Sequence, residues 1–448
     1  MTKDLTKGSV TKTMLLFACP MILGNLLQQC YNITDSLIVG RYIGSGALAA
    51  VGSAYTLMTF ITSVIIGLCM GSGTVFSVWF GRNEKTQLKN SIAVSFLFIA
   101  AVTLIINLVI FAAIDIILDA MNVPSEIYGS MREYVRLIFF GVFSVFLYNF
   151  FAFLLRSVGN SAVPLIFLGA AAALNILLDI LLVAVFGAGI RGAALATVIA
   201  QAVSGIGLGI YVLIKEPELC PKVMGLSICR ENVSGVIRHS AAACVQQSVM
   251  NFGILMIQGL VNSFGTATMA AFAAAVKIDS FAYMPAQEFS SAFSLFISQN
   301  HGSGKRDRVA EGTKKAMMIS ALFCLGASAV IFVLAPSLMQ LFVKGEEAEI
   351  IMAGTVYLRT EGSFYIGIGV LFLLYGFYRG IEKPEMSLIL TVLSLGTRVL
   401  LAYTLSPIPS IGVMGIWWAI PIGWLLADTV GILCMGKFYK QSEIQSIK

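Results

Sequence analysis

The chain has 448 residues, of which 58% are hydrophobic and 12% are charged, and its mean hydropathy is +0.89. These proportions exclude a soluble globular protein and indicate one that lies within a lipid bilayer. The formal net charge of +6 therefore says less about anionic partners than the distribution of Lys and Arg along the chain does. Polar stretches are too short for a soluble catalytic domain, and we expect no nucleic-acid partner.

Cysteine and histidine form no recognisable site. The eight Cys lie mostly inside apolar runs without C-x-x-C spacing, and His239 and His301 are far apart, with no Cys, Asp or His cluster beside them. The sequence therefore predicts neither a disulfide framework nor a zinc site. Because no His, Ser or metal constellation lies at bilayer depth, we expect neither an enzyme nor a cofactor.

Apolar runs long enough to cross a bilayer, about 18 residues or more, predict twelve transmembrane helices. In chain order they lie near 14–39, 48–78, 91–114, 131–155, 161–186, 191–214, 236–262, 267–299, 313–335, 353–378, 384–405 and 411–436. The first run is too long for the apolar region of a cleavable signal peptide. We therefore expect a multi-pass protein whose constant partner is the lipid bilayer.

The positive charges predict the orientation. With the amino terminus in the cytoplasm, 21 of the 29 Lys and Arg fall in cytoplasmic segments, six fall outside, and Lys277 and Arg398 lie within spans. Lys and Arg concentrate on the cytoplasmic side of membrane proteins. We therefore expect both termini to be cytoplasmic and the protein to lie in the cytoplasmic (inner) membrane.

The two halves of the chain share one pattern of loops and helices. GSGALAAV at 44–51 aligns with GTATMAAF at 265–272, an offset of 221 residues that recurs further along. We infer a duplication, with an amino-terminal lobe at 1–214, a cytoplasmic linker at 215–235 and a carboxy-terminal lobe at 236–448. The expected fold is an all-α membrane protein with twelve transmembrane helices in two pseudo-symmetric six-helix bundles around a central cavity, which is typical of secondary transporters.

Two acids at bilayer depth require an explanation, because charge is costly there. Asp35 lies near the outer end of the first helix, Asp179 near that of the fifth, and Thr197 near the outer start of the sixth. At 1.5 Å per residue, all three lie roughly 8 to 12 Å below the outer surface. Asn175 precedes Asp179 by four residues and shares its helix face. The sequence thus predicts one site from these four residues.

Two nearby carboxylates in a low dielectric cannot both stay charged without a cation. We interpret Asp35 and Asp179 as a coupling-ion site for H⁺ or Na⁺, with Asn175 and Thr197 supplying amide and hydroxyl groups. The residue types do not distinguish the two ions, and they predict no other metal. The alternative is a pair of structural carboxylates bonded to neighbouring hydroxyl groups.

The first helix carries a polar stripe in which Asn25, Gln28, Asn32 and Asp35 recur every three or four residues. Such a stripe should face a cavity or a partner helix rather than lipid. Below it, Pro20 removes one backbone hydrogen bond. This proline acts either as a static kink or as a hinge through which ion binding moves the helix.

The second half of the chain lacks counterparts of the two acids. At the offsets of the repeat, Met256 corresponds to Asp35 and Ala402 corresponds to Asp179. We expect the ion chemistry in the first lobe only, and a structural ion pair between Arg398 and Glu361. Candidate substrate-cavity residues, which packing could equally explain, are Gln28, Asn32, Gln247, Asn251, Lys277, Tyr283 and Glu288. Three acids at the outer end of the third helix are expected to be solvated loop charges: Asp115, Asp119 and Glu126.

Three segments resemble a known family. PMILGNLLQQCYNITDSLIVGRYIGSGALAAVG at 20–52, LNILLDILLVAVFGAGIRGAALATVIAQ at 174–201 and SQNHGSGKRDR at 298–308 look like parts of multidrug and toxic compound extrusion (MATE) transporters. The resemblance covers nearly the whole chain. It implies twelve helices in two lobes and an efflux antiporter, driven by H⁺ or Na⁺, that expels organic cations.

The resemblance also implies residue roles. By motif, Asp35 matches the acid of the family's first helix, Pro20 its bending proline, and Asn175, Asp179 and Thr197 its amino-lobe ion site. Some relatives instead bind Na⁺ through acids on the seventh and tenth helices. Here the seventh has none and the tenth only Glu361 near its outer end, which favours the amino-lobe site.

We therefore expect a monomeric secondary active antiporter that exports small organic cations in exchange for H⁺ or Na⁺. The alternative is a lipid-linked precursor flippase of the same superfold, which should line its cavity with several Arg or Lys to hold pyrophosphate. Only Lys277 and Arg398 lie at bilayer depth in this chain.

Overall fold

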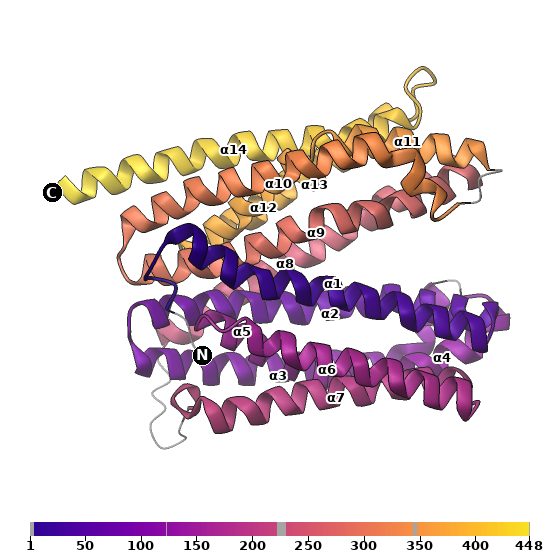
Figure 1. Ribbon diagram of the computed structural model, residues 1–448, viewed down its shortest axis with the longest axis horizontal. Helices are drawn as coiled ribbons and strands as arrows, with labels where there is room; N and C mark the ends of the chain where they lie inside the picture. The colour runs from indigo at the N-terminus through magenta and orange to yellow at the C-terminus, as the bar shows by residue number, and fades with distance from the viewer. Residues whose placement is uncertain (1–3, 122, 222–229, 344–346, 448) are drawn as a thin grey trace. The chain divides into compact units, whose positions relative to one another are not determined.

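The computed structural model describes residues 4–121, 123–221, 230–343 and 347–447. Over these ranges the backbone is helical almost throughout, and they contain no strand (Figure 1). The all-α fold predicted from the apolar runs is confirmed for this part of the chain.

Contacts between helices divide the chain into two units. Unit 1 comprises Met1–Leu5 and Cys19–Cys244, and unit 2 comprises Thr6–Ala18 and Val245–Lys448. Both divisions fall inside helices, since α1 covers Val10–Tyr42 and α8 covers Arg230–Asn262. The first turns of α1 therefore belong to unit 2, and the first turns of α8 belong to unit 1. Of the expected linker at 215–235, residues 222–229 lie outside the described ranges.

Unit 1 is built around α2, which packs against α3, α4 and α5, while α7 packs against α4, α5 and α6. Phe96, Phe146 and Phe150 form an aromatic cluster between α3 and α5, with ring centroids 5.2 to 5.8 Å apart. The complete helices of this unit are α2 (Ser45–Gly81), α3 (Lys85–Ala120), α4 (Ser125–Phe140), α5 (Val142–Ser157), α6 (Ala162–Asp179) and α7 (Gly189–Lys215).

Unit 2 is built around α12, which packs against α9, α10, α13 and α14. Trp417 stacks on Phe272 at 5.5 Å and meets Tyr357 edge-on at 4.8 Å, so aromatic rings fill the space between α9, α11 and α14. The complete helices of this unit are α9 (Thr266–Gly302), α10 (Arg306–Gln340), α11 (Ala348–Gly362), α12 (Tyr365–Gly380), α13 (Pro384–Leu405) and α14 (Met414–Ile447).

Within the described ranges, nine helices are long and apolar enough to cross a bilayer, or eleven spans if each of two bent pairs counts as one. The pairs are α4 with α5, bent by 44°, and α11 with α12, bent by 51°. The spans expected near 131–155 and 353–378 are therefore each made of two helices that meet at a bend. α9 adds a twelfth long segment of 37 residues, which carries Lys277, Asp279 and Glu288 within it.

Close helix contact in unit 1 depends on a residue without a side chain. A Cβ added to Gly205 on α7 would lie 2.3 Å from the carbonyl oxygen of Ser144 on α5, closer than any real Cβ contact. Glycine therefore lets α7 approach the α5 backbone. This contact holds the helix that carries Thr197, two turns nearer its amino end.

Candidate functional site

Unit 1 brings together the four residues that the sequence singled out. Asp179 is fully buried, Asn175 is 1% exposed and Thr197 is 7% exposed, while Asp35 on α1 is half-buried. Asn175 and Asp179 lie one turn apart at the end of α6, and Thr197 lies on the adjacent α7. Three helices therefore contribute polar groups to one place inside the unit.

The amide of Asn175 links α6 to α7. In one orientation its nitrogen donates to Thr197 Oγ1 at 3.4 Å. In the other, its nitrogen donates to Asp179 Oδ2 at 3.1 Å and its oxygen accepts from the Thr197 backbone N–H at 3.3 Å. The second orientation satisfies both ends of the amide, so it is the one we adopt. The Thr197 hydroxyl is already used, because it donates to the Ala193 carbonyl at 3.1 Å.

The helix changes its winding directly after Asp179. Residues Ile180–Val185 form a π-helix, in which each N–H reaches back five residues, as from Phe186 to Leu181 at 2.9 Å. π-turns are rare and occur frequently at functional sites. The wider turn changes the direction in which the side chains after Asp179 point around the helix axis. The spacing of apolar residues in the sequence does not predict such a change.

The carboxyl groups of Asp35 and Asp179 are in hydrogen-bonding contact with each other. Oδ1 of each is buried and receives no hydrogen bond from a donor group of the described residues. Two acceptors cannot bond to each other unless one carries a proton or a cation lies between them. The pair can therefore hold one small positive charge between two helices, α1 and α6.

Two phenol groups that the sequence reading overlooked belong to the same place. Tyr31 on α1 and Tyr134 on α4 both interact electrostatically with Asp35 and with Asp179. Tyr31 lies one turn before Asp35, so its position on the polar stripe was a usable signal. Tyr134 follows Glu133 on α4, and the expected site did not include this helix.

Unit 2 holds a second group of buried acids. Asp279 on α9 is 1% exposed and Glu361 on α11 is 4% exposed, and their carboxyl groups are in hydrogen-bonding contact. Tyr365 donates to Asp279 Oδ1, and Tyr357 interacts with both acids. Arg398 attracts Glu361 electrostatically, but no ion pair joins the two in the described residues. The expected Arg398–Glu361 ion pair is therefore wrong in its geometry, because Arg398 acts on Glu361 from beyond ion-pair distance, and Asp279 and Tyr357 interact with Glu361 as well.

The remaining candidate cavity residues fall in both units. Gln28 and Asn32 lie on the α1 stripe in unit 1, where Gln28 is exposed and Asn32 half-buried. In unit 2, Tyr283 interacts electrostatically with Asp279, Glu361 and Arg398. Lys277 is exposed, whereas three residues of this set are half-buried: Gln247, Asn251 and Glu288. Their role in a substrate cavity stays a prediction. α1 continues as a helix through Pro20, whose role as a hinge also stays a prediction.

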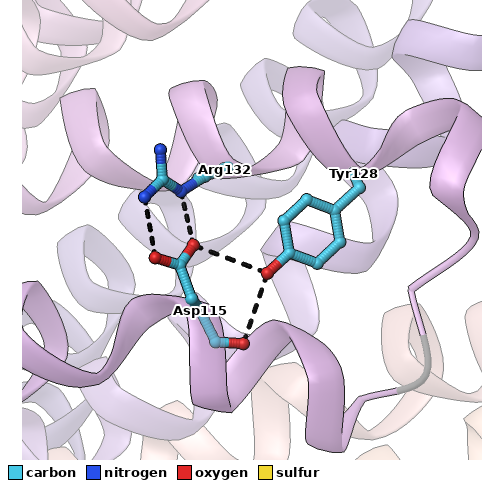
Figure 2. A network of polar contacts seen from close by, with 3 residues as sticks. All are labelled: Asp115, Tyr128 and Arg132. Carbon is cyan, nitrogen blue, oxygen red and sulfur yellow. Dashed lines mark hydrogen bonds and ion pairs between the residues drawn. The ribbon is translucent and has the colours of Figure 1, made fainter.

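Asp115, which was expected to be a solvated charge in a loop, belongs to a hydrogen-bonded network with Tyr128 and Arg132. Asp115 lies within α3, and Arg132 of α4 donates to both of its oxygens, with Nη2 to Oδ2 at 2.7 Å (Figure 2). The Tyr128 hydroxyl lies 3.4 Å from Oδ1. The carboxylate is half-exposed, as expected of a solvated charge, but Asp115 lies on α3 and not in a loop, because α3 extends further than predicted and places this carboxylate against α4.

Comparison with known proteins supplies independent information. The sequence profile of the MatE family matches residues 20–181 and 242–404. The chain is 28% identical over 395 residues to a probable multidrug resistance protein, YpnP, of Bacillus subtilis, covering 87% of each chain. It is 24% identical to the probable multidrug resistance protein NorM of Thermotoga maritima, covering 97% of this chain and 94% of that one.

Solved structures share the fold. A crystal structure described as MATE in the bent conformation superposes with a TM-score of 0.93 at 23% identity, covering 99% of this chain and 98% of that chain. An outward-facing MATE transporter of the MOP superfamily gives a TM-score of 0.91 at 24% identity over 99% and 98% of the two chains.

Proposed function

Because the chain belongs to the MatE family, and is therefore a multi-pass membrane transporter and not an enzyme, we propose that it is a secondary active antiporter for organic cations. The names of its relatives, which are probable multidrug resistance proteins, support the export of chemically varied small molecules. The same names give no support to a lipid-linked precursor flippase.

The observation that carries the proposal is the pair of Asp35 and Asp179, in which Oδ1 of each carboxyl group is buried. If both groups were charged, the pair would be too costly to enclose in a low dielectric, so enclosure requires a bound cation. Ion binding from the outside and substrate release to the outside therefore alternate with enclosure. Pro20 lies fifteen residues before Asp35 on the same helix and is the point at which we expect α1 to bend.

We propose that the coupling ion is a proton. The adopted orientation of Asn175 directs an N–H donor, not an oxygen, toward Asp179. The Thr197 hydroxyl donates to the Ala193 carbonyl, so it cannot also donate to a carboxylate, and it offers a cation one oxygen ligand only. Na⁺ needs several oxygen ligands at once, whereas a proton needs only the two carboxyl groups, which already interact with each other.

The arrangement in the membrane completes the proposal. The excess of Lys and Arg in the predicted inner loops supports cytoplasmic termini, and bacterial relatives support the inner membrane. The two units correspond in this proposal to two lobes that move during transport. All four residues of the candidate ion site lie in unit 1, which supports a site that one copy of the chain completes by itself and so a working monomer.

The test is dye efflux from vesicles that contain the purified full-length protein. An inward proton gradient should drive efflux of a cationic dye, and an inward Na⁺ gradient at constant pH should not. Efflux driven by Na⁺ alone would replace the proton in this proposal. Efflux under neither gradient would contradict antiport by this chain.

A further inference from the structure

A buried acid in unit 2 lies apart from both groups of acids described above. Asp428 on α14 is 6% exposed, and its buried Oδ1 receives no hydrogen bond. Its other oxygen, Oδ2, lies beside Gly367 on α12, where an added Cβ would be 3.7 Å from it. The carboxyl group thus lies inside the protein, between α14 and the first turns of α12.

No positive charge in the described part of the chain neutralises Asp428. α14 packs against α11, α12 and α13, whose titratable or charged groups include the following: Tyr357, Glu361, Tyr365, Tyr375, Tyr378, Arg379 and Arg398. Of these, Tyr375 alone interacts with Asp428. Tyr378 donates to the Gly431 carbonyl at 2.7 Å, and Cys434, on α14 itself, interacts with Tyr378.

The two nearby arginines are directed elsewhere. Arg398 interacts with Glu361, Tyr357 and Tyr283. Arg379 is 6% exposed, its Nη1 donates to Gln246 Oε1 at 3.4 Å, and its electrostatic partner is Tyr375. Tyr375 therefore interacts with a buried acid and with a buried base, which do not interact with each other.

A charged carboxylate in this environment would be costly, because neither a donor nor a cation compensates the loss of water. A hard metal ion is no better, since it needs several oxygen ligands, and the described residues contain no group of three His, Cys, Asp or Glu able to hold one. A single proton is enough to remove the charge. We propose that Asp428 is a proton-binding site of unit 2, separate from the Asp35–Asp179 pair and from Asp279 and Glu361.

Tyr375 couples the charge of Asp428 to other residues of unit 2. When Asp428 loses its proton, its new negative charge interacts electrostatically with Tyr375. Tyr375 also interacts electrostatically with Arg379, one turn further along α12. Arg379 in turn bonds to Gln246, the second residue of α8 within unit 2. Through Tyr375 and Arg379, the charge of Asp428 therefore affects the electrostatic environment of Gln246, which lies next to the division of α8 between the two units.

Proton binding itself does not depend on the proposed function, whereas a part in the transport cycle does. The direct test is pH-difference infrared spectroscopy of the purified full-length protein, because a protonated carboxyl group has its own C=O stretching band. We expect one such band at neutral pH to be absent in Asp428→Asn and retained in Asp307→Asn, which removes an exposed carboxyl group at the start of α10.

A second variant keeps the acid and changes only its neighbour. Gly367→Ser would place a hydroxyl donor beside Asp428 Oδ2, within space that an added Cβ can occupy. Since a donor stabilises the charged form, the band should titrate at lower pH in this variant. An unchanged spectrum in Asp428→Asn, or an unchanged titration in a folded Gly367→Ser protein, would overturn the proposal.

A transport measurement then distinguishes the proposed antiport function from the proposed proton site at Asp428. If proton antiport is correct, vesicles with Asp428→Asn should take up fewer protons for each dye molecule exported than wild type. If wild type shows no proton-driven efflux, the proposed function fails, and the infrared result for Asp428 still decides this inference by itself.

Discussion

At the scale of single residues, the site in unit 1 depends on one amide. Asn175 satisfies both of its ends, on Asp179 and on the Thr197 backbone, and is therefore fixed in orientation. A hydrogen bond to a charged or charge-sharing carboxyl group contributes about 1.5 to 3 kcal/mol. The amide is thus strong enough to decide how tightly Asp179 holds a proton.

Replacing this amide should alter the pH dependence of transport. In Asn175→Ala the carboxylate of Asp179 loses a donor, so its charged form is less favoured and the proton is released at higher pH. We expect the alkaline limb of the pH profile of dye efflux to move to higher pH. Asn149→Ala removes a half-buried amide on α5 outside the site and should leave the profile in place. Identical profiles in wild type and Asn175→Ala would contradict the assigned bond.

In unit 2 the corresponding residue-scale prediction concerns stability. Tyr365→Phe removes the donor to Asp279 and leaves a carboxyl oxygen buried without it, at a cost of about 1 to 3 kcal/mol. Tyr378→Phe removes a bond to a neutral carbonyl and should cost less, about 0.5 to 1.5 kcal/mol. Thermal unfolding of the two variants measures the difference. A larger loss in Tyr378→Phe would mean that Tyr365 does not stabilise Asp279.

At the scale of elements, close packing of α7 on α5 holds Thr197 beside Asn175. Gly205→Ala should push the two helices apart, because the new Cβ would meet the Ser144 carbonyl at 2.3 Å. Overpacking of this kind costs about 1 to 3 kcal/mol. Gly259→Ala on α8, where nothing lies within 4 Å, is the matched control and should unfold at nearly the wild-type temperature. Equal unfolding temperatures for both variants would show that α7 can move without penalty.

The second element-scale prediction concerns α1. Pro20→Ala restores the backbone N–H and so favours a straight helix. We expect slower dye efflux with an unchanged carboxyl band from the Asp35–Asp179 pair, because the bend is altered and the ion site is not. Pro336→Ala, in the last turns of α10, is the control for loss of a helical proline. Normal efflux in Pro20→Ala would leave this proline with only a static role.

At the scale of the whole molecule, composition and charge distribution determine most of what can be predicted. Twelve long helical segments and the all-α fold follow from apolar runs whose length matches the bilayer. Asp35, Asn175, Asp179 and Thr197 could be grouped because each helix has a fixed rise, so counting residues from the predicted outer ends gives similar depths.

The rest depends on how helices rotate and bend, which local patterns do not specify. The π-helix after Asp179 and the bends before Val142 and Tyr365 leave the apolar runs unchanged. Tyr134 and Asp279 meet their partners only through packing between helices. Asp428 was open to the same reasoning as Asp35, since it is also an acid within a predicted span.

The central claim is that the Asp35–Asp179 pair takes up and releases the ion that drives export. Dye efflux from vesicles under an inward proton gradient, measured with Asp35→Asn and with Asp179→Asn, tests it most directly. Each variant keeps the shape of the side chain but cannot exchange a proton. The account predicts that both lose proton-driven efflux while unfolding at temperatures close to that of wild type. Wild-type efflux in both variants would contradict it.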